Sequence, residues 1–386
     1  MEVVLLSIGY PPYFYFGGAE TYMKLLSKEL ARKGINVTAI AGWPRKEINI
    51  EKCGSMLKVI RLPVIDWPIR TVWYQLLNKN AIIKIIKKAD IVHSNNLVVS
   101  LINKKIMGFK PLITTMHGSP DALSTYFHSL KELGLSIGDL SYFIEYPLIK
   151  NLYFKDLLHS DALIFVSNHG YYEAIKYLGD KSSLITSKST VIYPWINIKE
   201  ISVEEPKWHS ARDLEVAYVG RLFWSKGVTY AIRAFGIIVN EMGKKAAKLH
   251  VIGDGPLRTW ILRYSKKNGL TKNINIYGQV SRELVLQTLI KTNVVALPSL
   301  YEGCPYVLLE SNALGIPVVT FDFKWSREFI KNSLNGFRSP PFDVYKLAES
   351  MLKATTLSSS SVKEEAKRYD VRFAINKIIE TYQKLM

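Results

Sequence analysis

Short apolar runs alternate with amphipathic helical patterns along the chain, and this alternation restricts the possible fold more than any other feature. Each run has the length of a strand, and the stretches between runs repeat apolar residues at helical spacing. Strands that are separated by helices pair in parallel, so the alternation predicts an α/β protein with parallel sheets. The predicted strands are residues 3–8, 36–41, 57–62, 90–93, 112–116, 162–166, 215–219, 248–252, 274–277, 293–297 and 316–321.

The predicted strands fall into two series, separated by a segment without sustained periodicity. A chain of 386 residues is too long for one ordinary core, so we expect two Rossmann-like, doubly wound domains. The separating segment contains two prolines and several charges, as linkers do. The expected parts are an N-terminal domain over 1–195, a linker over 196–212, a second domain over 213–360 and a C-terminal helix over 361–386 that packs back on the first domain.

Doubly wound domains bind ligands where strands end and helices begin, and the first such loop is rich in glycine. The sequence Gly17-Gly18-Ala19-Glu20 leaves room for a bulky ligand, and the helix start behind it favours an anion. A plain tight turn is the alternative. Residues 10–16 before it are strongly aromatic. Aromatic rings can pack against the face of a sugar or an apolar acceptor, or they can simply cover the edge of the sheet.

Two loops of the second series also have unusual composition. Arg221 and Lys226 lie between Gly220 and Gly227, where a guanidinium and an ammonium together suit a diphosphate leaving group. A solvated cation pair is the alternative. The loop over 253–257, Gly-Asp-Gly-Pro-Leu, is a turn by composition, and its place after a strand indicates that it lines a nucleotide site.

A pair of carboxylates, Glu302 and Glu310, surrounds a predicted helix start. Pro305 is well placed as the first helical residue, so Glu302 lies in the loop and Glu310 about one and a half turns into the helix. The amide groups of Gly303, Cys304, Tyr306 and Val307 are then unpaired donors at a helix start. The carboxylates could hold the hydroxyls of a sugar and of a ribose separately; a capping glutamate and a surface glutamate are the alternative.

These loops together resemble the family-4 retaining glycosyltransferases of the GT-B fold. The stretch from Glu302, EGCPYVLLESNALGIPVV, is similar to the family's EGFGLVLLEAMACGTPVV pattern, with two glutamates separated by seven residues. GRLFWSKGV resembles the family's diphosphate motif, GDGPLR its G-D/E-G-P loop, and GGAE its N-terminal glycine loop. The resemblance spans the whole chain and is strongest over residues 215–320. It implies a hexosyltransferase of the EC 2.4 class.

The resemblance also implies roles for matching residues. Arg221 and Lys226 would bind the diphosphate, Glu302 the donor sugar and Glu310 the ribose. Gly18 would give backbone room beside the phosphates. His117, which precedes Gly118 after a strand, resembles the family's active-site histidine at the interdomain cleft, although a lone histidine is more often structural. The expected catalytic residues are Glu302, His117, Arg221 and Lys226, and the expected donor-contacting residues are Gly17, Gly18, Arg221, Lys226, Gly253, Gly303, Cys304, Pro305, Tyr306, Val307 and Glu310.

The sequence departs from the family pattern in three places. The usual asparagine-glycine near the domain crossover is Pro194-Trp195, which puts the hinge in doubt. Pro305 replaces the second glycine that the family pattern has after the first glutamate. This variant should leave the backbone N–H donors of the loop intact. The acceptor-side segment 120–160 matches nothing that we can assign, so the acceptor is not readable.

The net charge of +18 calls for an anionic partner. No arginine-rich run or RNA-binding signature is present, so we expect a sugar nucleotide and not nucleic acid. Residues 70–88 combine large apolar side chains with five cations, which suits peripheral contact with an anionic membrane or an ordinary sheet-covering helix. Cys53 and Cys304 match no zinc or disulfide spacing. The apolar N-terminal segment resembles a first strand and lacks the features of a signal peptide. We therefore expect a cytoplasmic protein, which contacts at most the inner face of the membrane.

The function predicted from the sequence is a retaining, metal-independent transfer of a hexose-type sugar from a UDP- or GDP-sugar to a glycan, a lipid-linked acceptor or a small alcohol. No cofactor is expected, because cationic side chains can replace a divalent ion at the diphosphate. Another GT-B enzyme, such as an epimerase or a phosphorylase, and a non-catalytic nucleotide-sugar binder are the alternatives. A phosphorylase would need a lysine that binds pyridoxal phosphate, and we identify no such site in the sequence. The intact set of Arg221, Lys226, Glu302 and Glu310 argues against a non-catalytic binder.

Overall fold

The chain folds into two units, each with its own sheet and core. The computed structural model describes all residues except 12–16, 66–68, 96, 103, 120–136 and 202–213. The N-terminal unit contains the described residues of Met1–Asp121 and Gly134–Pro194 together with Arg372–Met386. The C-terminal unit contains those of Trp195–Val371.

An eight-stranded sheet forms the centre of the N-terminal unit. Its strand order is β3-β4-β2-β1-β5-β6-β7-β8, and every pair is parallel except the antiparallel edge pair β3–β4. Strands of a parallel sheet are buried on both faces and are therefore apolar throughout, as in β1, where Val3 to Leu6 are all buried. The strands are β1 (Glu2–Leu6), β2 (Asn36–Trp43), β3 (Asn49–Lys52), β4 (Leu57–Pro63), β5 (Ile91–Asn95), β6 (Leu112–Met116), β7 (Ala162–Phe165) and β8 (Ser189–Val191).

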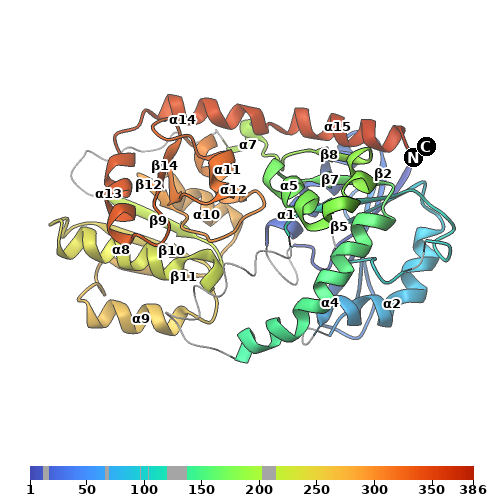
Figure 1. The fold of residues 1–386 in the computed structure, drawn as a ribbon, viewed down its shortest axis with the longest axis horizontal. Helices are drawn as coiled ribbons and strands as arrows, with labels where there is room; N and C mark the ends of the chain where they lie inside the picture. The colour runs from blue at the N-terminus through green and yellow to red at the C-terminus, as the bar shows by residue number, and fades with distance from the viewer. Residues whose placement is uncertain (12–16, 66–68, 96, 103, 120–136, 202–213) are drawn as a thin grey trace. The chain divides into compact units, whose positions relative to one another are not determined.

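Amphipathic helices cover this sheet (Figure 1). Helix α1 buries Tyr22, Met23 and Leu26 on one face, and Ile82 and Ile86 of α2 belong to one core cluster with residues of β1. The helices are α1 (Gly18–Arg32), α2 (Arg70–Ile86), α4 (Ile137–His159), α5 (Asn168–Leu178), α6 (Ser183–Thr186) and α15 (Val371–Gln383). Among the described helices, none is both long and apolar enough to cross a bilayer.

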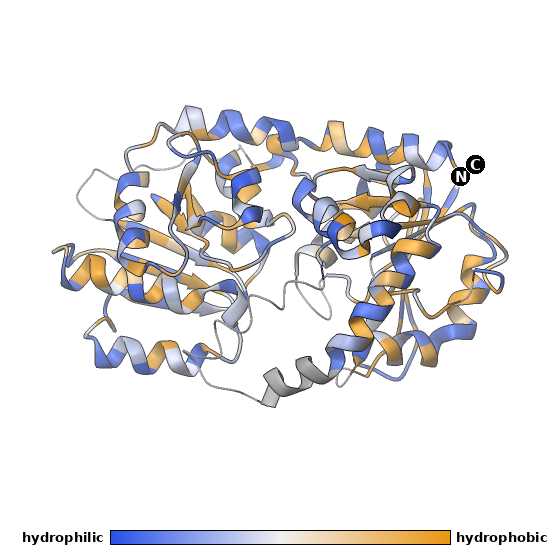
Figure 2. Ribbon diagram, in the orientation of Figure 1, coloured by the Kyte–Doolittle hydropathy of each residue, from blue (hydrophilic) through white to orange (hydrophobic). Residues whose placement is uncertain are grey.

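The C-terminal unit has a wholly parallel, six-stranded sheet in the order β11-β10-β9-β12-β13-β14. Its strands carry mainly hydrophobic residues, whereas the covering helices have mixed hydropathy (Figure 2). The strands are β9 (Glu215–Val219), β10 (Lys248–Ile252), β11 (Ile274–Gly278), β12 (Val294–Ala296), β13 (Val318–Phe321) and β14 (Gly336–Ser339). The helices are α7 (Ile198–Ile201), α8 (Val228–Asn240), α9 (Arg258–Lys267), α10 (Arg282–Leu289), α11 (Tyr306–Ala313), α12 (Lys324–Phe329), α13 (Val344–Ala354) and α14 (Ser359–Ala366).

The predicted α/β fold with parallel sheets is confirmed, and every predicted strand is present. Three strands were not predicted. All four residues of β3 are exposed at the sheet edge, so no buried pattern marks it. The strands β8 and β14 have three and four residues, too few for a periodicity to show.

The region predicted as one helix over 361–386 contains two helices and a break. Helix α14 buries Val362 and Ala366 within the C-terminal unit. The chain then leaves the helical conformation at Asp370, which pairs with Ile196 in a short parallel bridge. Helix α15 follows and packs in the N-terminal unit from Arg372 onward.

A buried chain of polar groups ties α15 to that sheet. The Tyr382 hydroxyl lies 2.6 Å from His93 Nδ1, and His93 Nε2 lies 2.6 Å from Thr115 Oγ1, which donates to the Tyr22 hydroxyl over 3.3 Å. Because Thr115 uses its single proton toward Tyr22, His93 donates from Nε2 and accepts from Tyr382 at Nδ1. All four side chains are buried, so each needs this partner.

Both sheets contain a point at which the strand order reverses. In the N-terminal unit it lies between β1 and β5, and in the C-terminal unit between β9 and β12. Loops leaving the carboxyl ends of two such strands diverge and leave a crevice at which ligands of this fold class bind. The sequence-predicted loops of the C-terminal unit, after β9 and β12, flank its reversal point.

Candidate functional site

The loops after β9 and β12 are in direct contact. Leu300 donates its amide to the Ser225 carbonyl over 2.9 Å. Gly227 has φ of +67°, and a Cβ there would lie 2.0 Å from the Pro298 carbonyl oxygen, so this position requires glycine. This close backbone approach fixes the loop that carries Arg221 and Lys226 (the cation loop) against the loop that carries Glu302 (the carboxylate loop).

Lys226 and Glu302 form an ion pair across that contact. Lys226 Nζ lies 2.7 Å from Glu302 Oε1, and the side chains are 24% and 11% exposed. Tyr218, buried below the loop, donates its hydroxyl to the Arg221 carbonyl over 2.9 Å and so supports the cation loop. A half-buried pair of opposite charges at a sheet reversal can bind an anion with the lysine and hydroxyls with the glutamate.

Arg221 is exposed on the same loop. Its guanidinium carbon lies 5.8 Å from the centre of the Phe223 ring, within the range of a cation–π contact. The guanidinium of an exposed arginine retains N–H groups that can donate to the oxygens of a diphosphate.

The glycines of the loop after β10 pack closely against the loop after β9. Gly253 has φ of +130°, and a Cβ at this position would lie 1.9 Å from the Gly220 carbonyl oxygen. A Cβ on Gly255 would lie 2.6 Å from the Leu222 carbonyl oxygen. Leu222 donates its amide to the Asp254 carbonyl over 2.9 Å. These glycines therefore permit backbone packing between the two loops, whatever else they contact.

Glu310 is buried on α11 and has a partner that the sequence analysis did not name. Arg282, the first residue of α10, donates from Nε to Glu310 Oε1 over 2.7 Å. The Glu310 side chain is 8% exposed, and burial raises the pKa of its carboxyl while the Arg282 charge opposes that rise. Arg282 follows a Gly278 to Ser281 loop at the end of β11, so the strand-to-helix rule used for the other loops would have found it.

The start of α11 offers backbone donors. Pro305, predicted as the first helical residue, is the N-cap instead, with an extended backbone, and the helix begins at Tyr306. Among the described residues, the amides of Gly303, Cys304 and Val307 donate to no acceptor. Burial raises the pKa of the Cys304 thiol well above its usual range, with the Glu328 and Glu302 charges adding to it, so this cysteine is a neutral thiol.

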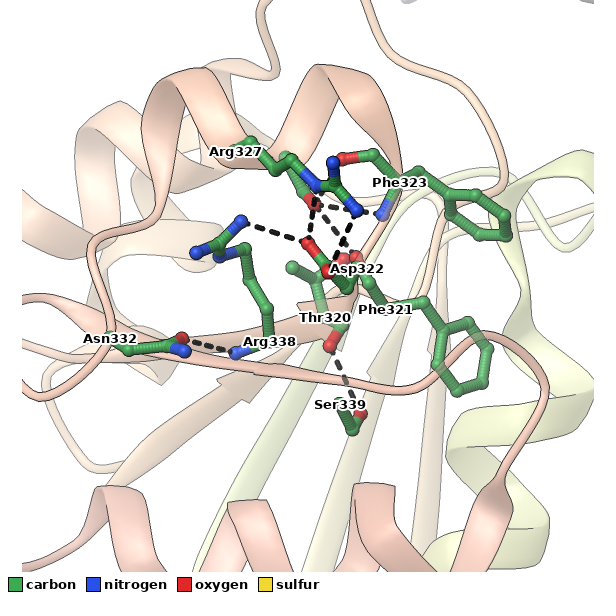
Figure 3. Close-up of polar contacts among 9 residues, drawn as sticks. Thr320, Phe321, Asp322, Phe323, Arg327, Asn332, Arg338 and Ser339 are labelled. Atoms are coloured by element: carbon green, nitrogen blue, oxygen red, sulfur yellow. Dashed lines mark hydrogen bonds and ion pairs between the residues drawn. The ribbon is translucent and has the colours of Figure 1, made fainter.

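A second charged cluster lies at the carboxyl end of β13. Figure 3 shows Asp322 between Arg327 and Arg338. Asp322 accepts from Arg327 Nε and Nη2 over 3.0 and 3.1 Å and from Arg338 Nη1 over 2.8 Å. The hydrogen bond from Arg327 lowers the pKa of Asp322. The carboxylate links α12 to β14 and fixes the loop between β13 and α12.

In the N-terminal unit, the predicted glycine loop opens α1. Gly17 is the N-cap and Gly18 the first, exposed helical residue. A Cβ on Gly17 would lie 2.6 Å from Glu20 Oε2. Of the aromatic segment over 10–16, Tyr10 is buried and hydrogen-bonds to Ser27, so it belongs to the core; residues 12–16 lie outside the described residues.

His117 follows β6 in the same unit. Its Nε2 lies 2.9 Å from Asn95 Oδ1, and its ring meets the Tyr22 ring edge to face at 5.0 Å. Burial lowers the pKa of His117 to about 3, so the imidazole is neutral near pH 7. Asn95, the last residue of β5, was not named from the sequence, although polar residues at a strand end were the available signal.

Two family models match consecutive parts of the chain. The model described as Glycosyltransferase Family 4 matches residues 16–200, and the model described as Glycosyl transferases group 1 matches residues 203–370. An uncharacterized glycosyltransferase of Methanocaldococcus jannaschii is 25% identical over 354 residues, which cover 87% of this chain and 84% of that protein.

One shorter match is to another glycosyltransferase, and two solved structures have a similar fold. The lipopolysaccharide 1,6-galactosyltransferase of Salmonella typhimurium is 29% identical over 188 residues, 46% of this chain and 49% of that enzyme. Sucrose-phosphate synthase from Thermosynechococcus elongatus has a TM-score of 0.78 at 18% identity, with 100% of this chain and 98% of that chain covered. The Anabaena protein HepE, solved with UDP and glucose, has a TM-score of 0.71 at 18% identity, with 99% of each chain covered.

Proposed function

Because the chain belongs to the family-4 glycosyltransferases and has the GT-B fold, we propose that it is a retaining, metal-independent member of them. As a glycosyltransferase it is an enzyme of the EC 2.4 class. In the proposed reaction a hexose-type sugar moves from a UDP- or GDP-sugar to a hydroxyl of a glycan, a lipid-linked acceptor or a small molecule. The observation that carries this proposal is the Lys226–Glu302 pair beside the open amides at the start of α11.

The proposed step begins with departure of the diphosphate. The bond between the anomeric carbon and the diphosphate oxygen breaks, and the oxygen keeps the electron pair. Arg221 and Lys226 stabilise the charge that builds on it, which is the kind of contact that lowers a barrier because it strengthens in the transition state. The acceptor oxygen bonds to the anomeric carbon on the same face, and its proton passes to the leaving diphosphate.

Glu302 has a second role in this proposal. In the structure, Glu302 Oε1 accepts a hydrogen bond from Lys226 Nζ. When a diphosphate is bound, the lysine has three N–H groups and can contact the phosphate while it keeps or releases the glutamate. Glu302 then accepts hydrogen bonds from hydroxyls of the transferred sugar and holds the anomeric carbon near the attacking oxygen.

The remaining predicted residues take supporting roles. Glu310 accepts from the ribose hydroxyls, and the amides of Gly303, Cys304 and Val307 face the phosphates. Gly253 allows the loop after β10 to lie close to the loop after β9 that carries Arg221 and Lys226. In the N-terminal unit, Gly17 and Gly18 leave room at the start of α1, and His117 contacts a hydroxyl of the reacting sugars. His117 is neutral, so it acts as a hydrogen-bonding group and not as a cation.

The donor and acceptor classes are drawn from similar proteins. HepE was solved with UDP-glucose, which makes UDP-glucose the first donor to test. The Salmonella relative is a lipopolysaccharide 1,6-galactosyltransferase, which favours a glycan as acceptor.

A thermal-shift series with nucleoside diphosphates tests donor binding. A ligand at about 100 times its dissociation constant stabilises the unit that binds it by roughly 2.7 kcal/mol, or about 5–11 °C. We expect a shift of this size for one nucleobase and a smaller one for the others. Nucleoside monophosphates are the control, because they lack the second phosphate that Arg221 and Lys226 are proposed to hold. Equal shifts for monophosphate and diphosphate would contradict the assignment of those two cations.

Peripheral contact with an anionic membrane is a second proposal, and exposed side chains of α2 support it. Trp73, Leu76 and Leu77 are 39%, 54% and 55% exposed and share one helix face. Four lysines lie on the same segment, Lys79, Lys84, Lys87 and Lys88. Large apolar groups between cations are typical of helices that lie on anionic bilayers.

Vesicle flotation tests this contact. We expect binding to phosphatidylcholine vesicles to rise with added phosphatidylglycerol, and Leu76→Ser to weaken it roughly tenfold or more, since a buried leucine contributes about 1.5–3 kcal/mol. Leu262→Ser on α9 is the matched control, because Leu262 is 53% exposed in the other unit. Binding that is independent of anionic lipid, or equally weakened by both substitutions, would contradict the proposal.

A further inference from the structure

Asn95 occupies a central place in the N-terminal unit. It is the last residue of β5, is 4% exposed, and lies at the point where the strand order reverses between β1 and β5. Its amide nitrogen donates to Ser7 Oγ over 3.0 Å and to the Ala19 carbonyl over 3.1 Å. Its amide oxygen lies 2.9 Å from His117 Nε2. One buried side chain therefore joins the ends of β1, β5 and β6 with the start of α1.

These partners fix the orientation of the Asn95 amide. The Ala19 carbonyl can only accept a hydrogen bond, so the Asn95 nitrogen must face it. The amide oxygen then faces His117, and this oxygen can also only accept. His117 must therefore carry a proton on Nε2, and because the ring is neutral its Nδ1 carries none.

Tyr22 lies in edge-to-face contact with the His117 ring, and the buried His93 interacts with it electrostatically. Burial raises the pKa of Tyr22 and lowers that of His93 to about 3, so both are neutral near pH 7. The hydrogen bond that His117 donates from Nε2 to Asn95 Oδ1 therefore favours the Nε2-protonated tautomer.

The same amide also fixes the glycine loop. Ala19 follows Gly18 directly, and its carbonyl belongs to the first turn of α1. A shift of Asn95 would move the helix start and the His117 ring together. Ser7 adds a third anchor, from the end of β1, so the amide cannot rotate without the loss of several hydrogen bonds.

We propose that Asn95 is a positioning residue that holds His117 in its neutral, Nε2-protonated form, so that Nδ1 accepts a hydrogen bond from a hydroxyl of the reacting sugars. The same side chain sets the place of the His117 ring relative to the first turn of α1. This inference rests on the proposed catalytic role of His117. Its tautomer, however, is a property of the unliganded protein and can be measured without turnover.

Nitrogen NMR of the full chain labelled with ¹⁵N-histidine tests the tautomer, with His117 assigned from a His117→Gln spectrum. We expect Nε2 protonated and Nδ1 unprotonated in the wild type, and a mixture of tautomers in Asn95→Ala. A wild-type His117 protonated on Nδ1 would overturn the proposal, whether or not the protein transfers sugar. Failure of the proposed function would instead appear as absent nucleotide binding with the tautomer unchanged.

The pH dependence of transfer tests the positioning role. Asn95→Asp places a carboxylate on the Nε2 proton, which favours the charged imidazolium and raises the pKa of His117. We expect kcat of this variant to fall as the pH is lowered from about 8 to about 5, whereas kcat of the wild type should show no such loss. In Asn95→Ala we expect a loss of roughly 5- to 150-fold in kcat, the factor equal to about 1–3 kcal/mol for one unsatisfied buried group.

Asn78 supplies the matched control. It is a buried asparagine of the same unit whose amide donates to the Pro63 and Tyr74 carbonyls, away from His117. Asn78→Asp should destabilise the unit and leave both the His117 tautomer and the pH profile of kcat unchanged. If Asn95→Asp gives the same pH profile as Asn78→Asp, Asn95 has no role in positioning His117 and the proposal is overturned.

Discussion

Glu302→Gln is expected to reduce sugar transfer by roughly 100- to 1,000-fold, the usual effect of removing one preorganised transition-state contact. The amide keeps the shape of the side chain, so the loop between β12 and α11 should stay in place. The substitution removes the negative charge and replaces one carboxylate oxygen, an acceptor for the sugar hydroxyls, with an NH₂ group that can only donate. The loss should fall on kcat measured at saturating nucleotide sugar.

Binding of the nucleoside diphosphate should respond in the opposite direction. Lys226 pairs with Glu302 over 2.7 Å, so the substitution frees the ammonium for the phosphates, and the affinity for the diphosphate should stay the same or rise. The Lys331–Glu365 pair, with N–O distance of 2.9 Å and Glu365 16% exposed, offers a matched control in the same unit. Glu365→Gln should leave kcat unchanged. If Glu302→Gln weakens diphosphate binding as much as transfer, Glu302 supports the loop and does not contact the sugar.

The fold could be predicted from the sequence because its causes are local. Buried parallel strands leave continuous apolar runs, and the helices between them leave one apolar face, as Tyr22, Met23 and Leu26 do on α1. The edge strand β3 leaves no such pattern, since all of its residues are exposed. Nor does the sequence mark the break at Asp370, where the chain leaves α14 for α15, because pairing with a residue about 170 positions earlier fixes it.

The candidate site was predictable where one loop carries its own pattern. Arg221, Lys226, Glu302 and Glu310 stand at fixed spacings in loops that follow strands. What the sequence could not supply is which of these side chains pair. The Arg282–Glu310 contact joins residues 28 positions apart on two helices, and it depends on the order of strands β11 and β12 in the sheet.

The glycines show the same limit. Gly253 was predicted to line the nucleotide site, and its composition alone indicated a turn. The structure adds a reason of another kind, since its Cα approaches the Gly220 carbonyl so closely that no side chain fits. A glycine pattern thus indicates that another group approaches the backbone closely. Only the folded structure shows whether that group is a ligand or a neighbouring loop.

Arg282→Met is expected to make nucleotide binding depend on pH. Burial raises the pKa of Glu310, and Arg282 opposes that rise. Without the arginine the pKa rises further, so the carboxyl takes up a proton at a higher pH than in the wild type and then accepts fewer hydrogen bonds from the ribose. We expect the affinity for the nucleoside diphosphate to fall by about 1–3 kcal/mol at low pH, as for the loss of a hydrogen bond to a charged group. Titration calorimetry across about pH 5 to 8 measures it.

Stability without ligand should change with pH in the opposite sense. A carboxyl with a raised pKa in the folded state binds more protons folded than unfolded, so the free energy of unfolding falls as the pH rises through that pKa. The Arg282→Met protein should therefore lose stability as the pH rises through the pKa of Glu310, while its affinity for nucleotide increases over the same range. Arg263→Met, at an exposed arginine of α9, is the control and should show neither trend. A 2′-deoxynucleotide should bind the Arg282→Met protein with a much weaker pH dependence, because it lacks one hydroxyl that Glu310 is proposed to hold. The same pH dependence for both nucleotides would place the ribose elsewhere and leave Glu310 a structural residue.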